Sequence, residues 1–320
     1  MIRAALALAL TLGVTAALQP PPALAATAAP EPSKGGFTWA VQPSGPKGPT
    51  GRDHFVYSAA PGQKIEDTVG ITNGGRSALT FKVYATDAFN TADGSFALLT
   101  AAQRPRDVGT WTTFKAATYE VKPGKRLDVP FTVTVPHDAT PGDHSGGVIA
   151  AVTEQVPNAR GQRVNVDRRV AARVYLRING PLSPAVQIDD ITTAHDTPTL
   201  GSGPLTVTYR VRNTGNVRVT AGARITAQGP VGTLGKPVSR TIPELLPGAG
   251  YTFTERIPGV APAGRLTASV KLTPADPGNG SPLRPTTRAA STWAVPWLPL
   301  AATVLLIVAA IALLRRRKTS

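Results

Sequence analysis

The chain has 320 residues, no cysteine and a formal net charge of +15 at pH 7. Without cysteine, disulfide bonds, thiolate chemistry and Cys-ligated metal sites are excluded. The 31 Gly and 31 Pro residues favour many turns over long helices. Arg outnumbers Lys 24 to 10, which together with abundant Ala, Gly and Pro indicates a GC-rich, actinobacterial type of genome.

Residues 1–25 have the pattern of a secretory signal peptide. Arg3 supplies the positive charge at the start, residues 4–18 are apolar, and an A-x-A cleavage site ends at residue 25. Residues 26–36 are rich in Ala and Pro and are expected to be disordered after cleavage. The chain is therefore predicted to be exported.

Residues 37–180 are predicted to form an immunoglobulin-like β-sandwich. Short runs alternate apolar and polar residues, as between Leu127 and Val135, and turns of Gly and Pro separate them. Trp111 is expected to open one such strand, and residues 157–167 are expected to be a charged hairpin tip. Many short alternating strands with almost no helical periodicity are typical of a sandwich.

Residues 181–274 are predicted to form a second immunoglobulin-like β-sandwich, because they repeat landmarks of the first. Residues 69–75 align with 209–215, each segment ending in Asn-x-Gly. The Pro-Gly pair at 123–124 aligns with the pair at 247–248. The predicted fold class is thus all-β, with two tandem sandwiches and one C-terminal transmembrane helix.

The C-terminal part is predicted to be a flexible linker (275–292), a transmembrane helix (293–314) and a cytoplasmic basic tail (315–320). The apolar run is long enough to cross a hydrocarbon core of ~30 Å as a helix. Tryptophans are favoured at the membrane interface, and basic residues keep the adjacent end in the cytoplasm. The anchor residues are Trp293, Trp297, Arg315, Arg316, Arg317 and Lys318. The N-terminal part is then outside.

The exterior part is basic, with 29 basic residues against 19 acidic ones once Arg3 and the tail are left out. Such a surface attracts polyanions, here anionic wall polymer or lipid phosphate. A charge bias that only improves solubility is the open alternative. Nucleic acid is not expected as a partner, because this part of the chain faces outward.

No catalytic motif, metal site or cofactor is expected, and the chain is predicted not to be an enzyme. His137 and His144 flank a Pro-Gly turn with Asp138 and Asp143, but their spacing matches no zinc motif. There is no G-x-S-x-G elbow, S-x-x-K or P-loop.

Two sets of residues are candidates for binding a ligand. On the predicted strand 169–178, Arg169, Arg173, Tyr175 and Arg177 share the outward parity and could meet an anionic polymer or a sugar. A solvated outer sheet face is the alternative. Trp39 and Trp111 are candidate sugar-stacking platforms or, alternatively, core residues.

Several landmarks together resemble a known family. They are Trp39-x-Val41-x-Pro43, Pro61-Gly62, Pro123-Gly124 before Phe131, and Pro136 to Val148 with its Gly146-Gly147 pair, followed by a second β domain and a membrane span. This pattern resembles the WxL-interacting protein family in an actinobacterial, membrane-anchored form. The resemblance implies a first domain that binds peptidoglycan and a second domain that binds a host or ligand protein.

The predicted function is a non-catalytic adaptor in the cell wall of a Gram-positive bacterium. Its first domain would bind peptidoglycan or wall polymer, and its second would bind another surface protein. The alternative is a structural or assembly partner for another exported protein, acting through an exposed sheet edge without wall binding of its own.

Overall fold

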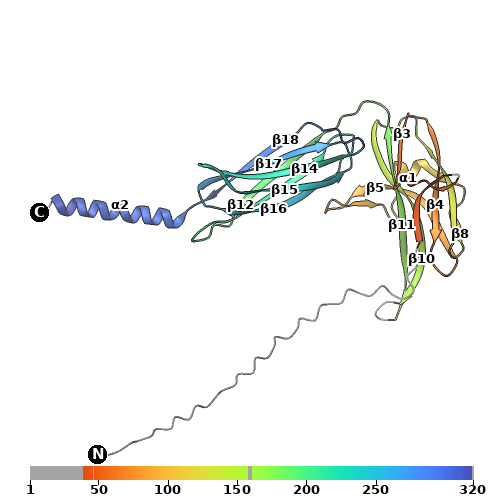
Figure 1. Ribbon diagram of the computed structural model, residues 1–320, viewed down its shortest axis with the longest axis horizontal. Helices are drawn as coiled ribbons and strands as arrows, with labels where there is room; N and C mark the ends of the chain where they lie inside the picture. The colour runs from red at the N-terminus through yellow and green to blue at the C-terminus, as the bar shows by residue number, and fades with distance from the viewer. Residues whose placement is uncertain (1–38, 46, 158–160, 319–320) are drawn as a thin grey trace, which may run out of the picture. The chain divides into compact units, whose positions relative to one another are not determined.

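The computed structural model describes residues 39–45, 47–157 and 161–318. The predicted signal peptide (1–25) and the segment 26–36 lie outside these residues. The described chain forms two tandem immunoglobulin-like β-sandwiches, followed by one long apolar helix (Figure 1). The predicted fold class is confirmed.

The first sandwich packs a sheet of order β2-β1-β4-β9-β7 against one of order β3-β11-β10-β5-β6, in which β8 also pairs with β5. All neighbours are antiparallel except β3, which runs parallel to β11. The elements are β1 (Trp39–Gly45), β2 (Gly48–Pro49), β3 (Phe55–Ala59), β4 (Lys64–Asn73), β5 (Leu79–Asn90), β6 (Phe96–Leu98), α1 (Val108–Trp111), β7 (Thr112–Phe114), β8 (Thr118–Val121), β9 (Arg126–Thr134), β10 (Gly142–Pro157) and β11 (Arg163–Ile178).

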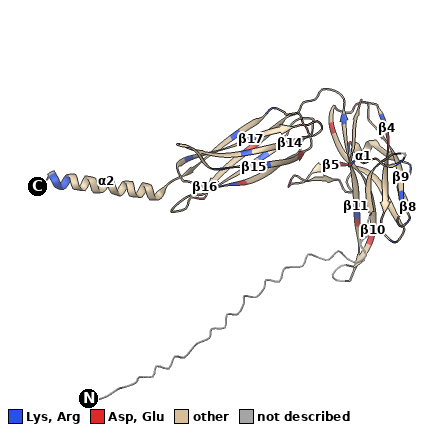
Figure 2. Ribbon diagram, viewed as in Figure 1, with Lys and Arg blue, Asp and Glu red and all other residues tan. Residues whose placement is uncertain are grey.

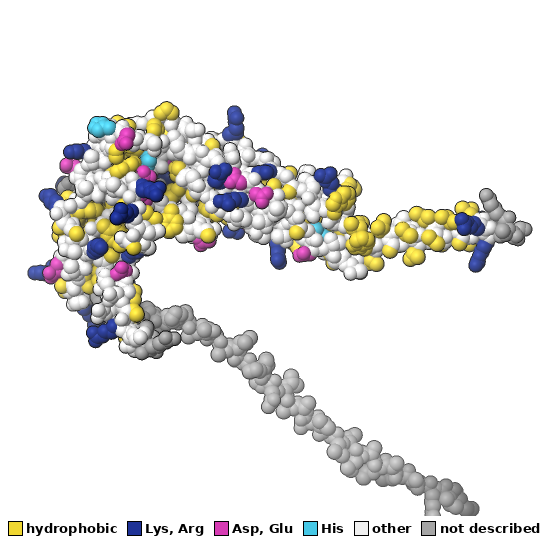
Figure 3. Space-filling model, turned by 180° about the vertical axis from the view of Figure 1, so that it is seen from behind, with side chains coloured by type: hydrophobic (Ala, Val, Ile, Leu, Met, Phe, Trp, Pro, Cys, Tyr) yellow, Lys and Arg dark blue, Asp and Glu magenta, His cyan; other side chains and the backbone are white. Residues whose placement is uncertain are grey.

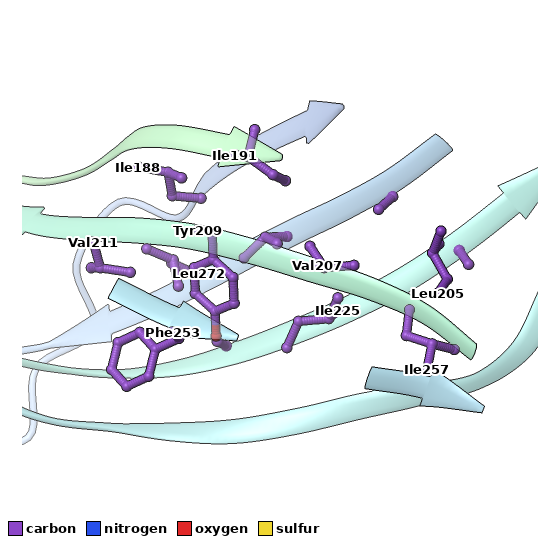
Figure 4. Close-up of a cluster of buried hydrophobic side chains, with 14 of the residues drawn as sticks. Ile188, Ile191, Leu205, Val207, Tyr209, Val211, Ile225, Phe253, Ile257 and Leu272 are labelled. Carbon is purple, nitrogen blue, oxygen red and sulfur yellow. The ribbon is translucent and has the colours of Figure 1, made fainter. Parts of the chain in front are cut away.

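The second sandwich packs a sheet of order β12-β13-β16 against one of order β15-β14-β17-β18. Along β13, Leu205, Val207, Tyr209 and Val211 are each at most 1% exposed, because alternate side chains of a strand share a face. Figure 4 shows these residues among the buried side chains between the two sheets. The strands are β12 (Val186–His195), β13 (Gly203–Asn213), β14 (Val219–Gly229), β15 (Gly232–Leu245), β16 (Gly250–Val260), β17 (Gly264–Ala275) and β18 (Thr286–Ala294).

The internal repeat is confirmed by a pair of equivalent buried asparagines. The Asn73 amide donates to the carbonyls of Ser77 and Val121 at 2.8 and 2.9 Å. The Asn213 amide donates to the carbonyls of Val217 and Leu245 at 2.7 and 3.0 Å. Each side-chain oxygen also accepts from the amide of the glycine two residues on. In both sandwiches, therefore, a buried asparagine side chain holds the end of a strand to the turn that follows it by the same hydrogen bonds.

The prediction of a flexible linker over residues 275–292 is wrong for residues 286–292. Residues 286–294 form β18, which pairs with β17 from Leu272↔Thr286 to Gly264↔Ala294. The segment is rich in Thr, Ala and Ser, a composition that resembles a linker. An edge strand needs only one modest apolar face, and here Ala290 and Ala294 supply it against the core. The second sandwich therefore extends to residue 294.

The C-terminal helix α2 spans Trp297–Lys318 and is long and apolar enough to cross a membrane. The predicted start of this helix at Trp293 is wrong, because Trp293 lies in β18 opposite Arg265. Only Val295 and Pro296 separate the last strand from the helix.

Candidate functional site

The hairpin of β10 and β11 is longer than the sheet around it. Each strand has 16 residues, and the two pair along their whole length. On one side, β5 covers only Gly146–Ala151 of β10. On the other side, β3 covers only Val174–Ile178 of β11. Within the described residues, 152–157 and 163–168 pair only with each other, and we call this two-stranded extension the arm (Figure 1).

One face of the arm continues the core-facing row of the sandwich. Residues opposite each other in the register share a face, as Val156 and Val164 do, and as Glu154 and Val166 do. Val164 and Val166 are 40% and 36% exposed, although they have the same parity as the fully buried Val174. The arm therefore carries an apolar face that the opposite sheet of the sandwich leaves uncovered.

The charges on this face are paired, and the other face is polar. Glu154 and Arg168 form an ion pair at 3.4 Å beside the valines. On the other face, the Thr153 hydroxyl donates to Asp167 at 2.6 Å. The arm is thus an amphipathic ribbon with one apolar and one hydrophilic side.

The outer edge of β11 is unpaired over residues 163–173 within the described part of the chain. A strand edge of this kind presents N–H and C=O groups that another extended chain can pair with. The exposed arginines Arg163, Arg168 and Arg169 line this stretch, and edge charges discourage unselective pairing between copies.

The opposite end of the hairpin is held by a partly buried ion cluster. Asp143, at the start of β10, accepts two hydrogen bonds from the Arg177 guanidinium at 2.7 and 2.9 Å. It also accepts from the main-chain amide of Arg218 at 2.9 Å. Arg177 reaches Asp276 at 3.0 Å as well. The Asp143 side chain is only 4% exposed, so it links residues of both sandwiches away from solvent. Figure 2 shows acidic and basic positions on the strands of both sandwiches.

Tyr175 and Glu244 extend this cluster. The Tyr175 hydroxyl donates to Glu244 at 2.8 Å, and the Arg218 guanidinium lies 3.8 Å from the Tyr175 ring centre. Arg218 also pairs with Glu244 at 2.7 Å. Burial and the Glu244 charge raise the pKa of Tyr175, which keeps its hydroxyl a donor. Burial opposes the charge on Asp276, but its hydrogen bond from Arg177 lowers the pKa of that carboxyl.

Main-chain contacts add to this junction. The Asp143 amide donates to the Asn216 carbonyl at 2.7 Å, and the Asn216 side chain donates to the Pro141 carbonyl at 2.9 Å. Gly142 has φ 123°, and a Cβ there would lie 2.2 Å from the Asn216 oxygen. Only glycine, which has no Cβ, allows the main chain at residue 142 to come this close to Asn216.

His144 is a titratable group beside the junction. One ring nitrogen lies 3.3 Å from Asp107 and the other lies 2.9 Å from the Thr140 carbonyl, so both face acceptors. Burial disfavours the charged ring, but Asp107 and the Thr140 carbonyl, with a further contribution from Asp143, raise the pKa of His144 above its ordinary 6.5. The Trp111 ring centre is 4.9 Å away.

We expect protonation of His144 to stabilise the fold. Because its folded pKa is raised, this stabilisation is fully present below about 6.5 and is lost as pH rises through the raised value. Tryptophan emission from Trp111 should titrate with a midpoint above 6.5, and His144→Gln should abolish that step. A midpoint below 6.5, or an unchanged step in the variant, would contradict this assignment.

The predicted row of outward arginines is not a free solvent face. Arg169 is exposed and donates to the Leu99 carbonyl at 3.1 Å. Arg173 lies 4.5 Å from the centre of the Phe96 ring. Tyr175 is only 5% exposed, and Arg177 is held by two carboxylates. The parity is as predicted, but β6 and residues of the second sandwich cover this face of β11.

The two tryptophans also pack inside the first sandwich. Trp39 makes an edge contact with Phe81 at 5.8 Å between ring centres. Trp111 is 9% exposed and ends the short helix α1, so the predicted strand there begins one residue later, at Thr112. The predicted sugar-stacking platforms are thus half-buried or buried side chains.

No described residues form a group of three or more His, Asp or Glu side chains suited to holding a metal ion. Sequence reasoning missed the arm, because it assigned 157–167 to a charged hairpin tip. Strand β10 runs to Pro157 and β11 starts at Arg163. The alternation of Val164 and Val166 was the signal that a strand continues there.

Comparisons with known proteins identify no family for this chain. No family model matches it, and no curated protein matches it. Among solved structures, it is similar to a chain of the chaperone–tip adhesin complex of CFA/I fimbriae, with 10% identity, a TM-score of 0.40, and coverage of 79% of this chain and 98% of that one. The SafB chaperone–SafA pilin complex of Salmonella enterica gives 9% identity, a TM-score of 0.35, and coverage of 79% and 97%. The CupB2 chaperone of Pseudomonas aeruginosa gives 11% identity, a TM-score of 0.35, and coverage of 76% and 99%.

These findings correct two predictions. Membership of the WxL-interacting family is wrong, since no family model matches the chain. The peptidoglycan-binding adaptor is wrong with it, and the cell-wall and Gram-positive setting has no support from the comparisons. At 9–11% identity, the likenesses concern the fold alone.

Proposed function

We propose that this protein is an exported, membrane-anchored assembly partner that binds an extended segment of another exported protein. The observation that carries the proposal is the free edge of β11 on the arm, beside the exposed face of Val164 and Val166. Strand addition at such an edge gains main-chain hydrogen bonds, and the valines select alternate apolar side chains of the added segment.

The ion cluster around Asp143 supports this role because it restricts the movement of the arm. It joins the end of the β10–β11 hairpin opposite the arm to residues of the second sandwich. Preorganisation of this kind lowers the ordering cost of binding. The helix α2 anchors the protein, with Arg315–Arg317 on the cytoplasmic side and both sandwiches outside.

Site-specific photocrosslinking in cells tests this proposal. A photoreactive amino acid at Val166 should crosslink to a discrete exported protein. The same group at Asn165, the next residue on the polar face, should crosslink far less. A second test replaces Val164 and Val166 by Glu, which should remove the crosslink from a probe at Val156 without unfolding the protein, since both valines are exposed. Equal crosslinking from both faces, or none from either, would refute strand-edge binding.

A further inference from the structure

The end of the second sandwich from which α2 leaves is unusually apolar. Outside α2, the three most exposed large hydrophobic side chains among the described residues are Val231, Leu200 and Trp293, at 99%, 82% and 72%. The next, Val56, is 58% exposed and belongs to the first sandwich. Isolated exposed apolar residues are ordinary, but the most exposed ones gathered at one end need an explanation.

The strand registers place these residues at one end. β17 begins and β18 ends at the pair Gly264↔Ala294. The hairpin turn that carries Val231 closes at Gly229↔Gly232, and a Cβ on Gly229 would lie 3.7 Å from Ala263, in the β16–β17 turn. The loop 196–202, with Leu200, follows His195, whose ring contacts the Val260 carbonyl at 2.9 Å. We call this end of the sandwich the exit end. It consists of the loops 196–202, 230–231 and 261–263 together with Arg265 and Trp293, which are paired at the adjacent ends of β17 and β18.

The opposite end of the same sandwich already has a neighbour. Asn216, Glu244 and Asp276 lie there and contact residues of the first sandwich. The exit end makes no equivalent contact among the described residues. Figure 3 shows hydrophobic side chains where the second sandwich ends and the helix α2 begins.

The covalent link to α2 limits how far this end can be from a bilayer. Two residues, and so three Cα–Cα steps, separate Ala294 from Trp297. An extended chain spans at most ~3.5 Å per step, or roughly 10 Å in all. The headgroup layer on each side of a bilayer is about 5–8 Å thick. If Trp297 lies at the hydrocarbon boundary, Ala294 lies within or just above the headgroups. A flexible linker over 275–292 would have allowed the second sandwich to lie far from the bilayer. The ordered strand β18 takes up residues 286–294 and leaves only a short connection.

The chemistry of the exit end suits a lipid surface. Trp293 and Trp297, 72% and 63% exposed, are of the residue type that concentrates at the membrane interface. Arg265, exposed and opposite Trp293 in the register, can reach lipid phosphates, while Asp196 offsets its charge. Apolar insertion, not charge attraction, is therefore the expected driving force.

We infer that the exit end of the second sandwich docks on the lipid bilayer, with Leu200 and Val231 inserted among the headgroups. This inference rests on the membrane anchoring in the proposed function. Docking at this end would hold the second sandwich against the membrane and restrict the directions in which the chain can present the arm.

The experiment uses the full-length chain in phosphatidylcholine vesicles. Because the chain has no cysteine, single cysteines at Leu200, Val231, Leu182 and Val304 can each carry an environment-sensitive fluorophore. Leu182 is the matched control, a 47% exposed leucine that precedes β12, at the other end of this sandwich. Val304, inside α2, reports the anchor itself.

With quencher-labelled lipids, probes at Leu200 and Val231 should shift to the blue and lose most of their emission, in high salt as in low salt. The Leu182 probe should keep its emission. If Val304 is quenched but Leu200 and Val231 behave like Leu182, the docking inference fails and the anchor stands. If Val304 is not quenched, the anchor fails and the inference fails with it. Crosslinking from Val166 reports the arm independently of either result.

Discussion

Replacing Asn213 by Ala is expected to destabilise the second sandwich by about 3–4 kcal/mol, because two buried carbonyls lose their donor and the half-buried Gly215 amide loses one of its two acceptors. The side chain is fully buried, so water does not replace the lost hydrogen bonds. The carbonyls of Val217 and Leu245 would remain in the protein interior without a donor. Urea unfolding followed by far-ultraviolet circular dichroism measures the change.

The first sandwich supplies a matched experiment. Asn73→Ala removes the equivalent bonds to Ser77, Val121 and Gly75, and should cost a similar free energy of unfolding. Asn165→Ala, on the exposed polar face of the arm, should change it by no more than about 0.5 kcal/mol. A loss below about 1 kcal/mol at both buried sites would show that the turns relax and re-pair these groups.

The asparagine pair also shows what the sequence could predict. Asn-x-Gly after an alternating strand, followed later by Pro-Gly, is a local pattern with a local physical cause, and it recurs in both domains. The tandem sandwiches could therefore be inferred from strands and turns alone. The same alternation between Leu127 and Val135 correctly indicated the buried row of β9, where Val129, Phe131 and Val133 are at most 3% exposed.

The candidate site was harder to predict because it depends on distant residues. The parity of Arg177 on its strand was right, but Asp276, 99 residues away, decides that this arginine is paired. The pattern of Val164 and Val166 indicates an inward face, but it does not show where the opposite sheet stops. Strand β18 was missed because small residues serve both edge strands and linkers.

Replacing Asp143 by Ala is the second change from which we expect a large effect, about 3–5 kcal/mol of lost stability, because it leaves two partly buried guanidiniums without their shared carboxylate. Arg177 would still form its ion pair with Asp276, and Arg218 its ion pair with Glu244. The cluster would therefore be weakened but not lost. The Arg218 amide would also lose its acceptor. Urea unfolding again measures the loss.

The distinguishing readout is the coupling between the two sandwiches. In the native protein, Asp143 binds Arg177 of the same hairpin and Arg218 of the second sandwich, so we expect the two to unfold together. Trp293→Phe and Trp297→Phe leave Trp39 and Trp111 of the first sandwich as the emitting tryptophans. In the Asp143 variant on this background, tryptophan emission, which then reports the first sandwich, and circular dichroism, which reports both, should give separate midpoints. Asp138→Ala, at an exposed carboxylate of the preceding loop, is the control and should leave a single transition. Coincident midpoints in Asp143→Ala would show that the main-chain contacts at Asn216 are sufficient to couple the sandwiches, and that the ion cluster is not needed to hold the base of the arm.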